Sequence, residues 1–152
     1  MWITKLEEDE EFPDGNILND LESDLIQFYR LLQNDTKKEE LIRRLSAEIA
    51  TKERHSEMKQ YIPQTDVDVA FKTYYLNRTS YSGIINAPAW GYAEGKSSPP
   101  ANWGAFIEKA SEKLQDVDLY AEDYSSILHL RPKGKRVLIY LDPPYFHADQ
   151  KR

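Results

Sequence analysis

The stretch VLIYLDPPY, residues 137–145, sets the expectation for both the fold and the site. Together with the preceding Arg136, the apolar residues of this stretch form the segment RVLIYL (136–141). This segment predicts a strand buried on both faces, as in a parallel sheet. The two prolines that follow Asp142 lack backbone N–H groups and therefore end the strand. In open α/β sheets, ligands bind beyond the carboxyl ends of the strands, and DPPY stands at such an end.

A turn at the end of a strand would by itself explain two prolines. Judged from average residue usage, however, DPPY should occur by chance in on the order of one in a thousand chains of this length. Asp142 offers a carboxylate and Pro143 a rigidly held carbonyl, and two fixed acceptors suit a substrate –NH₂ group. They would stabilise the positive charge that develops when a nucleobase amine attacks the methyl group of S-adenosylmethionine. Tyr145 can stack on the flipped base, and Pro144 completes the predicted catalytic motif.

Strand and helix patterns alternate along the rest of the chain. Residues 15–19 predict a short strand, VDLYAED (117–123) predicts another, and YSSIL (124–128) predicts a helical turn. A helix with an apolar face is expected from Trp103 to Leu114. Three earlier helices are expected to start at capping residues, namely Asp20, Thr36 with Glu39, and Thr65 or Asp66.

Two segments leave alternatives open. Residues 51–60 are polar and predict either an exposed helical extension or irregular chain. Residues 77–100 hold three glycines and three prolines and predict a long loop. Such loops are functional or disordered, and the aromatic side chains of this one argue against disorder. The order of elements is an α/β pattern interrupted by a helical, loop-bearing insertion.

Composition excludes several classes of protein. The 152 residues suit one ordinary domain, and the apolar runs are too short to span a bilayer, so no membrane partner is expected. The absence of cysteine excludes disulfides and thiolate metal sites and fits a reducing cytoplasm. His55, His129 and His147 show no metal-ligand spacing. We therefore expect them at ordinary surface or loop positions, and no metal site.

Charge is distributed unevenly. The formal net charge of −6 argues against a nucleic acid partner, because phosphate repels a negative surface. Residues 71–106, however, carry three basic residues against one acidic residue, together with eight aromatic residues. This is where a polyanion would bind, although burial of the rings in the core is the favoured interpretation. The basic pairs Lys37-Lys38 and Arg43-Arg44 favour a solvated helix face over a DNA-binding patch.

Four segments together resemble the Dam-like adenine-specific DNA methyltransferases. NILNDLESDLIQFYRLLQND (16–35) is similar to the segment after that family's cofactor-binding glycine loop, and YYLNRTSYSGII (74–85) to the start of its DNA-contacting region. YAEDY (120–124) is similar to a segment near the cofactor adenine, and LDPPY (141–145) to the catalytic motif. The resemblance covers nearly the whole chain, in the order of the family.

The resemblance implies a partial Rossmann-like methyltransferase sheet with a helical DNA-recognition insertion. It implies that Asp20 accepts the ribose hydroxyls of S-adenosylmethionine and that Asp123 lies near its adenine. Double-stranded DNA is the implied partner. Tyr81 is the implied inserting aromatic, with Ser82 and Ile84 beside it, and Asn77 and Arg78 belong to the frame of the same DNA-binding loop.

The sequence departs from the pattern of this family in two places, and these departures determine the domain organisation that we expect. MWITKLEEDEEFPDG stands where the family has its glycine-rich loop, and the strands expected after Tyr145 are missing. We therefore expect an internal fragment: partial catalytic segments over residues 1–35 and 116–152, and a helical insertion over 36–115 with its DNA-contacting loop at 77–100. Activity of the chain alone is not expected. The alternative is an inactive remnant, or a split-enzyme half that binds DNA or a complementing chain carrying the missing cofactor loop.

Overall fold

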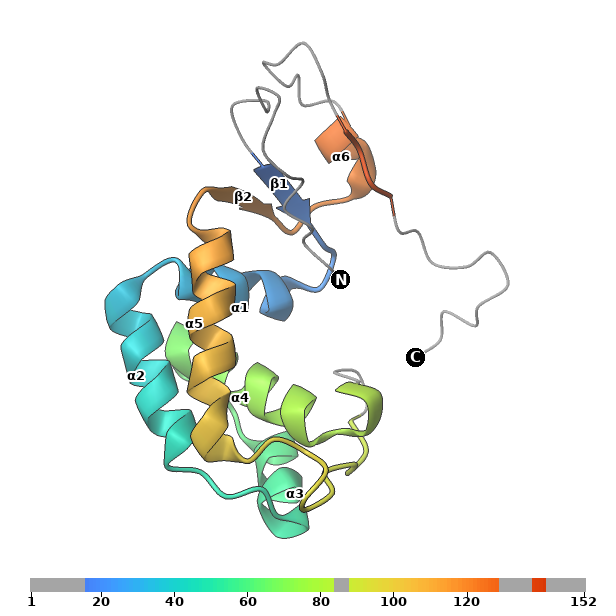
Figure 1. Ribbon diagram of the computed structural model, residues 1–152. Coiled ribbons are helices and arrows are strands. Elements are labelled where there is room, and N and C mark those ends of the chain that lie inside the picture. The colour runs from blue at the N-terminus through green and yellow to red at the C-terminus, as the bar shows by residue number, and fades with distance from the viewer. Residues whose placement is uncertain (1–15, 84–87, 129–137, 142–152) are drawn as a thin grey trace.

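The computed structural model describes residues 16–83, 88–128 and 138–141 (Figure 1). The regular elements are, in chain order, β1 Asn16–Asn19, α1 Ser23–Leu32, α2 Asp35–Ser46, α3 Lys52–Gln60, α4 Asp66–Thr79, the 3₁₀ turns η1 Tyr81–Gly83 and η2 Pro100–Asn102, α5 Trp103–Leu114, β2 Val117–Tyr120 and α6 Tyr124–Leu128. In Figure 1, helices α1 to α5 gather on one side of a small sheet, and α6 lies near the sheet.

The sheet of the described residues consists of two strands. β1 and β2 pair in parallel, with Asn16 opposite Val117 and Asn19 opposite Tyr120. A parallel pair needs a crossover connection, which helices α1 to α5 provide here. The strand predicted over residues 15–19 is confirmed for residues 16–19, and the one predicted over residues 117–123 is confirmed for residues 117–120 but ends at Tyr120. The observed architecture is thus mixed, with many helices and a small parallel sheet; the expected Rossmann-like sheet stays a prediction.

One hydrophobic core joins the sheet to the helices. Its largest fully buried side chains are Trp103 of α5 and Tyr75 of α4, whose rings meet edge-on with centroids 5.9 Å apart. Leu18 of β1 and Leu119 of β2 belong to the same core, because alternate residues of each strand face the helices. The interpretation of the aromatic-rich segment as core is therefore confirmed for Tyr75, Trp103 and the buried Phe71.

The start of α4 follows the predicted pattern. The hydroxyl oxygen of Thr65 accepts a hydrogen bond from the backbone N–H of Asp68, and the Asp68 carboxylate accepts one from the backbone N–H of Thr65. This reciprocal capping box satisfies two N–H groups that the helix itself leaves unpaired.

Two other predicted helix starts are wrong by a few residues. Asp20 does not cap α1, which begins at Ser23; the Asp20 carboxylate instead accepts from the backbone N–H of Glu22. The cap of α2 is Asn34, because its extended backbone lets its side chain accept from the N–H of Lys37. The residue chosen from the sequence, Thr36, lies inside the helix.

Residues 51–60, for which two structures remained open, form the separate helix α3. The hydroxyl of Thr51 caps it by accepting from the N–H of Arg54. Although most of its side chains are polar, His55 and Met58 are buried. They lie three residues apart on one face of the helix, which packs on α4.

The strand expected over residues 136–141 does not form in its described part, Leu138–Leu141. These four residues have no regular structure, and their side chains are exposed by 57 to 79%. A strand needs a neighbour that pairs its backbone groups, and no strand among the described residues pairs with this segment.

Candidate functional site

The two predicted cofactor-binding acids follow neighbouring strands at the same edge of the sheet. Asp20 comes directly after β1, and its N–H donates to the carbonyl oxygen of Tyr120 at 3.2 Å. The side chain of Asn19 donates to the carbonyl of Glu122 at 2.8 Å and accepts from its N–H at 3.0 Å. These bonds hold the two segments together beyond the ends of the strands, so that Asp123 leaves the sheet beside Asp20.

Asp20 is half-buried and keeps part of its hydrogen-bonding capacity. One carboxylate oxygen accepts from the N–H of Glu22 at 2.9 Å, and the other has no hydrogen-bond partner within the described part of the chain. Burial, assisted by the negative charge of Asp20, raises the pKa of the nearby Tyr29 hydroxyl. Asp20 can therefore still accept from a ligand hydroxyl.

Asp123 is exposed at the start of α6. One of its carboxylate oxygens accepts from both the hydroxyl and the backbone N–H of Ser125, and these hydrogen bonds lower the pKa of Asp123. The carboxylate is thereby held in its ionised form at the edge of the sheet.

A second group of predicted residues lies at the end of α4, in a short two-stranded ribbon. Ser80 forms an antiparallel bridge with Trp90, the N–H of Tyr81 donates to the carbonyl of Ala89 at 2.8 Å, and the N–H of Gly91 donates to that of Thr79 at 2.9 Å. We call residues 79–81 and 89–91 the ribbon base.

Gly91 allows the two sides of the ribbon base to approach closely. A Cβ atom at this position would lie 2.4 Å from backbone atoms of Tyr81, which no side chain tolerates. The backbone of Tyr81 is thus packed tightly, yet its side chain is 68% exposed.

The turn after Tyr81 is set by local hydrogen bonding. Ser82 has φ 54° and Gly83 has φ 66°, so both residues adopt the left-handed backbone conformation. The side chain of Asn77 donates to the carbonyl of Gly83 at 2.8 Å and fixes this turn against α4. Ser82 is exposed beside Tyr81.

Arg78 lies near the end of α4, three residues before Tyr81 in the sequence. Its guanidinium carbon lies 5.3 Å from the centre of the Phe106 ring, which is half exposed on α5. The Nε atom of Arg78 and the Oγ atom of Ser80 are buried and have no hydrogen-bond partner among the described residues. Both residues precede the exposed tyrosine in the chain.

His55 is a residue that the sequence analysis misjudged. It was expected at an ordinary surface or loop position, but it is only 2% exposed and contacts the ribbon base. The error has a physical cause, because α3 shows no strong apolar face; the spacing of His55 and Met58 was the one available signal. His129 and His147 lie outside the described residues.

The structure thus groups Asp20 with Asp123 at the edge of the sheet, and Arg78, Tyr81 and Ser82 at the end of α4. The remaining predicted site residues lie outside the described residues, namely Ile84, Asp142, Pro143, Pro144 and Tyr145.

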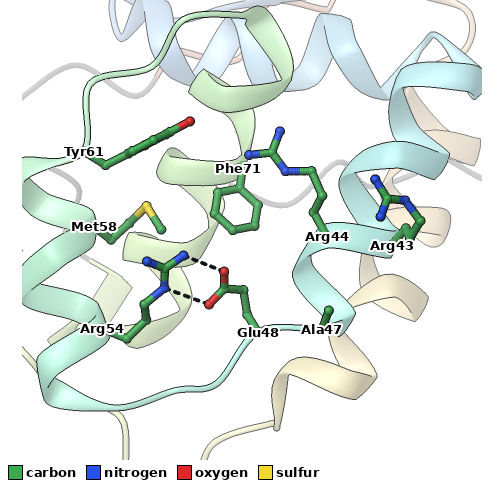
Figure 2. Close-up of a pocket in the computed structure, with 8 residues that line it drawn as sticks. All are labelled: Arg43, Arg44, Ala47, Glu48, Arg54, Met58, Tyr61 and Phe71. Atoms are coloured by element: carbon green, nitrogen blue, oxygen red, sulfur yellow. Dashed lines mark hydrogen bonds and ion pairs between the residues drawn. The ribbon is translucent and has the colours of Figure 1, made fainter.

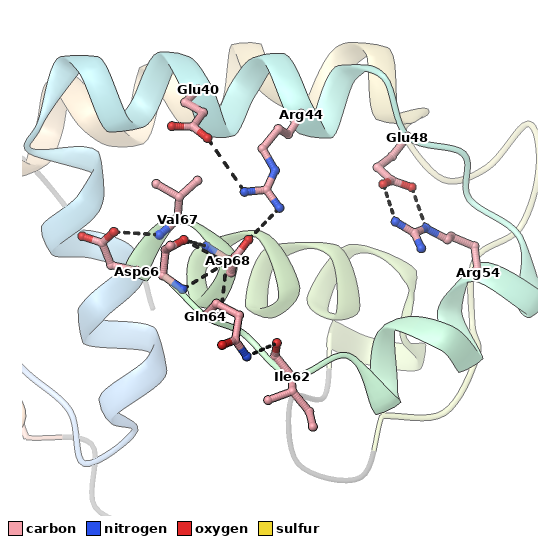
Figure 3. Close-up of polar contacts among 10 residues, drawn as sticks. Glu40, Arg44, Glu48, Arg54, Ile62, Gln64, Asp66, Val67 and Asp68 are labelled. Atoms are coloured by element: carbon pink, nitrogen blue, oxygen red, sulfur yellow. Dashed lines mark hydrogen bonds and ion pairs between the residues drawn. The ribbon is translucent and has the colours of Figure 1, made fainter.

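A cavity of about 300 Å³ lies between α2, α3 and α4, away from all predicted site residues (Figure 2). Its lining includes Arg44 and Arg54, and both are paired with acids. Arg54 donates two hydrogen bonds to Glu48, at 2.7 and 2.9 Å, and Arg44 donates one to Asp68 at 2.9 Å (Figure 3). Because these charges are compensated, we assign the lining a role in packing the helices.

Two searches of the described residues found nothing further. No helix in residues 16–83, 88–128 and 138–141 is long and apolar enough to cross a membrane. The same residues hold no group of three or more histidine, cysteine, aspartate or glutamate side chains that could bind a metal ion.

Comparison with known families defines the class of protein as a DNA methyltransferase. Residues 11–152 match the model of the D12 class N6 adenine-specific DNA methyltransferases. The match covers most of the chain, so the chain belongs to this family, and the family predicted from the four sequence segments is confirmed. A search of curated proteins found no match.

Proposed function

We propose that this chain takes part in the transfer of a methyl group from S-adenosylmethionine to the exocyclic amine of a flipped adenine in double-stranded DNA. The exposure of Tyr81 is the observation that carries the proposal. Its backbone is tied to Ala89 and pressed against Gly91, while its ring is 68% exposed. A ring displayed in this way can enter the space that a base leaves when it is extruded from the stack.

The neighbours of Tyr81 fit a DNA-contacting role. Arg78 holds its guanidinium against Phe106, where it can reach a phosphate without first having to be ordered. Ser82 and Ile84 follow the tyrosine in the sequence and would contact the duplex beside it. The acidic net charge disfavours a nucleic acid partner, so the contact with DNA depends on this local basic and aromatic group.

The edge of the sheet fits part of S-adenosylmethionine. Ribose hydroxyls are donors, and the half-buried Asp20 retains one oxygen that can accept from them. The ionised Asp123 lies at the same edge and would face the adenine end. Nothing in the sequence supplies a glycine-rich loop for the methionine part, so the fit extends to the ribose and adenine only.

The DPPY residues would carry the chemistry. S-adenosylmethionine supplies a methyl carbon on a positively charged sulfur, and the carbon–sulfur bond breaks as the new nitrogen–carbon bond forms. Asp142 and the carbonyl of Pro143 accept the two hydrogens of the adenine amine and stabilise the charge that develops on its nitrogen. Pro144 would keep the turn rigid and Tyr145 would stack on the flipped base. After transfer, the methylated nitrogen would lose one proton to water, and the neutral thioether S-adenosylhomocysteine would leave.

The test is methyl transfer to unmethylated genomic DNA, with N6-methyladenine as the measured product. The chain is mixed with a second polypeptide that carries a glycine-rich cofactor loop of this family. We expect product from the mixture, none with Asp142→Ala, and little with Asp142→Asn, because the carboxylate charge is needed. DNA affinity should stay nearly unchanged in both variants, since Asp142 contacts the base rather than phosphate. Turnover retained by Asp142→Ala would show that the motif is misassigned.

A second candidate function is that of a non-catalytic half, which binds DNA or a companion chain. The exposed apolar segment Leu138–Leu141 favours it, because four such side chains in a row suit burial against a partner strand. The companion would be a chain that carries the glycine-rich loop. Binding of that chain or of DNA, with no methyl transfer in the mixture, would support this second function over the first.

A further inference from the structure

His55 and Thr79 form a buried polar pair between α3 and the ribbon base. Nδ1 of His55 lies 2.8 Å from Oγ1 of Thr79, and the two residues are 2% and 0% exposed. The hydroxyl of Thr79 uses its one hydrogen to donate to the carbonyl of Tyr75 at 2.7 Å. The hydroxyl oxygen can therefore only accept from His55, which makes Nδ1–H of the histidine the donor.

The same imidazole ring also contacts the returning side of the ribbon. Its ring meets that of Trp90 edge-on with centroids 5.6 Å apart, and its Nε2 lies 3.3 Å from the carbonyl oxygen of Pro88. With the hydrogen on Nδ1, a neutral ring has none on Nε2 to donate to this carbonyl, so the ring contact with Trp90 is what reaches the returning side. Thr79 leads into the ribbon, whereas Pro88 and Trp90 lie on its way back. One side chain from α3 thus touches both sides.

The ribbon base needs support from outside. It consists of one antiparallel bridge and the two backbone hydrogen bonds that flank it. An isolated two-stranded ribbon is at best marginally stable in water, even when it is longer than this one. Within the described residues, His55 of α3 supplies such support, because it contacts Thr79 on one side of this base and Trp90 on the other.

We propose that His55 is a positioning residue, which holds the ribbon base closed and thereby fixes where Tyr81 is displayed. The inference rests on the proposed function of Tyr81 only where it predicts an effect of His55 on DNA binding. Closure of the ribbon base is a property of the chain by itself and can be measured without DNA.

The competing explanation is that His55 merely fills space in the core, and two pairs of variants separate the explanations. His55→Phe keeps a ring beside Trp90 but removes both nitrogens, whereas His55→Asn keeps a donor near the position of Nδ1. Thr79→Val removes the hydroxyl with little change of shape, and Thr79→Ser keeps it. Under simple filling, Phe should replace His55 better than Asn does.

Amide hydrogen exchange of the full chain measures the ribbon base directly, through the N–H groups of Tyr81 and Gly91. We expect His55→Phe and Thr79→Val to speed exchange of these two amides by about tenfold or more, the effect of losing a buried hydrogen bond. Thr79→Ser and His55→Asn should stay closer to the unmodified chain. The amide of Ile26 in α1 is the reference for changes elsewhere in the chain, and its exchange should speed up less than that of Tyr81 and Gly91. Unchanged protection of Tyr81 and Gly91 in both His55→Phe and Thr79→Val would overturn the proposal.

DNA affinity tests the consequence, by fluorescence anisotropy with a short labelled duplex of mixed sequence. We expect His55→Phe to weaken binding by about the same factor as Tyr81→Ala, and the double variant to be no weaker than either, because coupled residues are not additive. Additive losses would overturn the claim that His55 acts through Tyr81. If Tyr81→Ala binds DNA as the unmodified chain does, the proposed function of Tyr81 fails, and the amide exchange alone decides on His55.

Discussion

At the scale of the residue, exposure separates aromatic side chains that the sequence places close together. Tyr75 is fully buried, and its hydroxyl donates to the carbonyl of Ile49 at 2.7 Å. Tyr81, six positions later, lies beyond the end of α4 with its ring in solvent. Truncating Tyr75 would open a cavity in the core, and truncating Tyr81 would not. The two tyrosines therefore serve as a matched pair for experiments.

Tyr81→Ala should lower the thermal midpoint little and should impair methylation of paired adenine more than methylation of a mismatched adenine. The reason is that unstacking costs a few kcal/mol and costs least where the base is already mismatched. Methylation rates on the two DNAs, measured in the mixture with the companion polypeptide, together with the thermal midpoint, check this.

Tyr75→Ala is the control for Tyr81→Ala and should cost roughly 3–5 kcal/mol of stability, by analogy with other buried aromatics. Tyr81→Phe should retain most of the rate, since insertion requires the ring and not the hydroxyl. A large fall of the midpoint in Tyr81→Ala, with equal losses on both DNAs, would contradict the role assigned to Tyr81.

At the scale of the element, the start of α4 is tied to α2 by charge. Burial alone would raise the pKa of Asp68, but hydrogen bonds from Tyr61, Arg44 and Thr65 outweigh it and lower that pKa. Figure 3 shows the hydrogen bond from Arg44 to Asp68. Folding therefore favours the ionised carboxylate. The stability it contributes is fully present above the unfolded-state pKa of about 3.9 and is lost as the pH falls through the lower folded-state value.

Asp68→Asn should lower the free energy of unfolding by about 1–3 kcal/mol at neutral pH, because it weakens the capping box and leaves Arg44 without its partner. The difference between the variant and the unmodified chain should shrink as the pH falls below about 4, where the Asp68 carboxylate of the unfolded chain begins to be protonated. Urea unfolding at several pH values measures it. Asp118→Asn on the exposed face of β2 is the control and should show neither effect; a pH-independent difference for Asp68→Asn would refute the assigned role of charge.

At the scale of the whole molecule, the two predicted groups of site residues belong to different ends of one core. The edge of the sheet carries Asp20 and Asp123, and the end of α4 carries Tyr81. Helices α1, α4 and α5 pack between them around Trp103 (Figure 1). The helical part can therefore present a DNA contact whether or not the sheet edge holds a ligand.

The chain alone should bind S-adenosylmethionine poorly. Asp20 and Asp123 can contact the ribose and adenine, but no glycine-rich loop in this sequence encloses the methionine part. Titration calorimetry with the chain and with Asp20→Ala checks this. Micromolar affinity that Asp20→Ala removes would contradict the prediction and would show that the sheet edge suffices.

The local sequence was enough to predict a helix or strand where neighbouring residues alone determine it. The choice of Thr65 or Asp66 as a cap predicted the start of α4, the segments at 15–19 and 117–123 predicted β1 and β2, and YSSIL predicted α6. The family followed from four short segments in order, and it is confirmed. Caps were less certain where several candidates adjoin, as at Asn34 and Thr36, because the backbone conformation decides which side chain reaches an N–H group.

Tertiary structure decided which side chains are covered. Apart from its spacing to Met58, the imidazole of His55 in a polar helix gives no sign of burial, and only the packing of α3 on α4 placed it against Thr79. Tyr75 and Tyr81 are alike in sequence terms, and the end of α4 separates them. The apolar run Leu138–Leu141 has the composition of a buried strand but lies exposed, because a strand exists only where a neighbour completes its hydrogen bonds. Burial depends on contacts between parts of the chain that are distant in sequence, so a local sequence pattern cannot predict it.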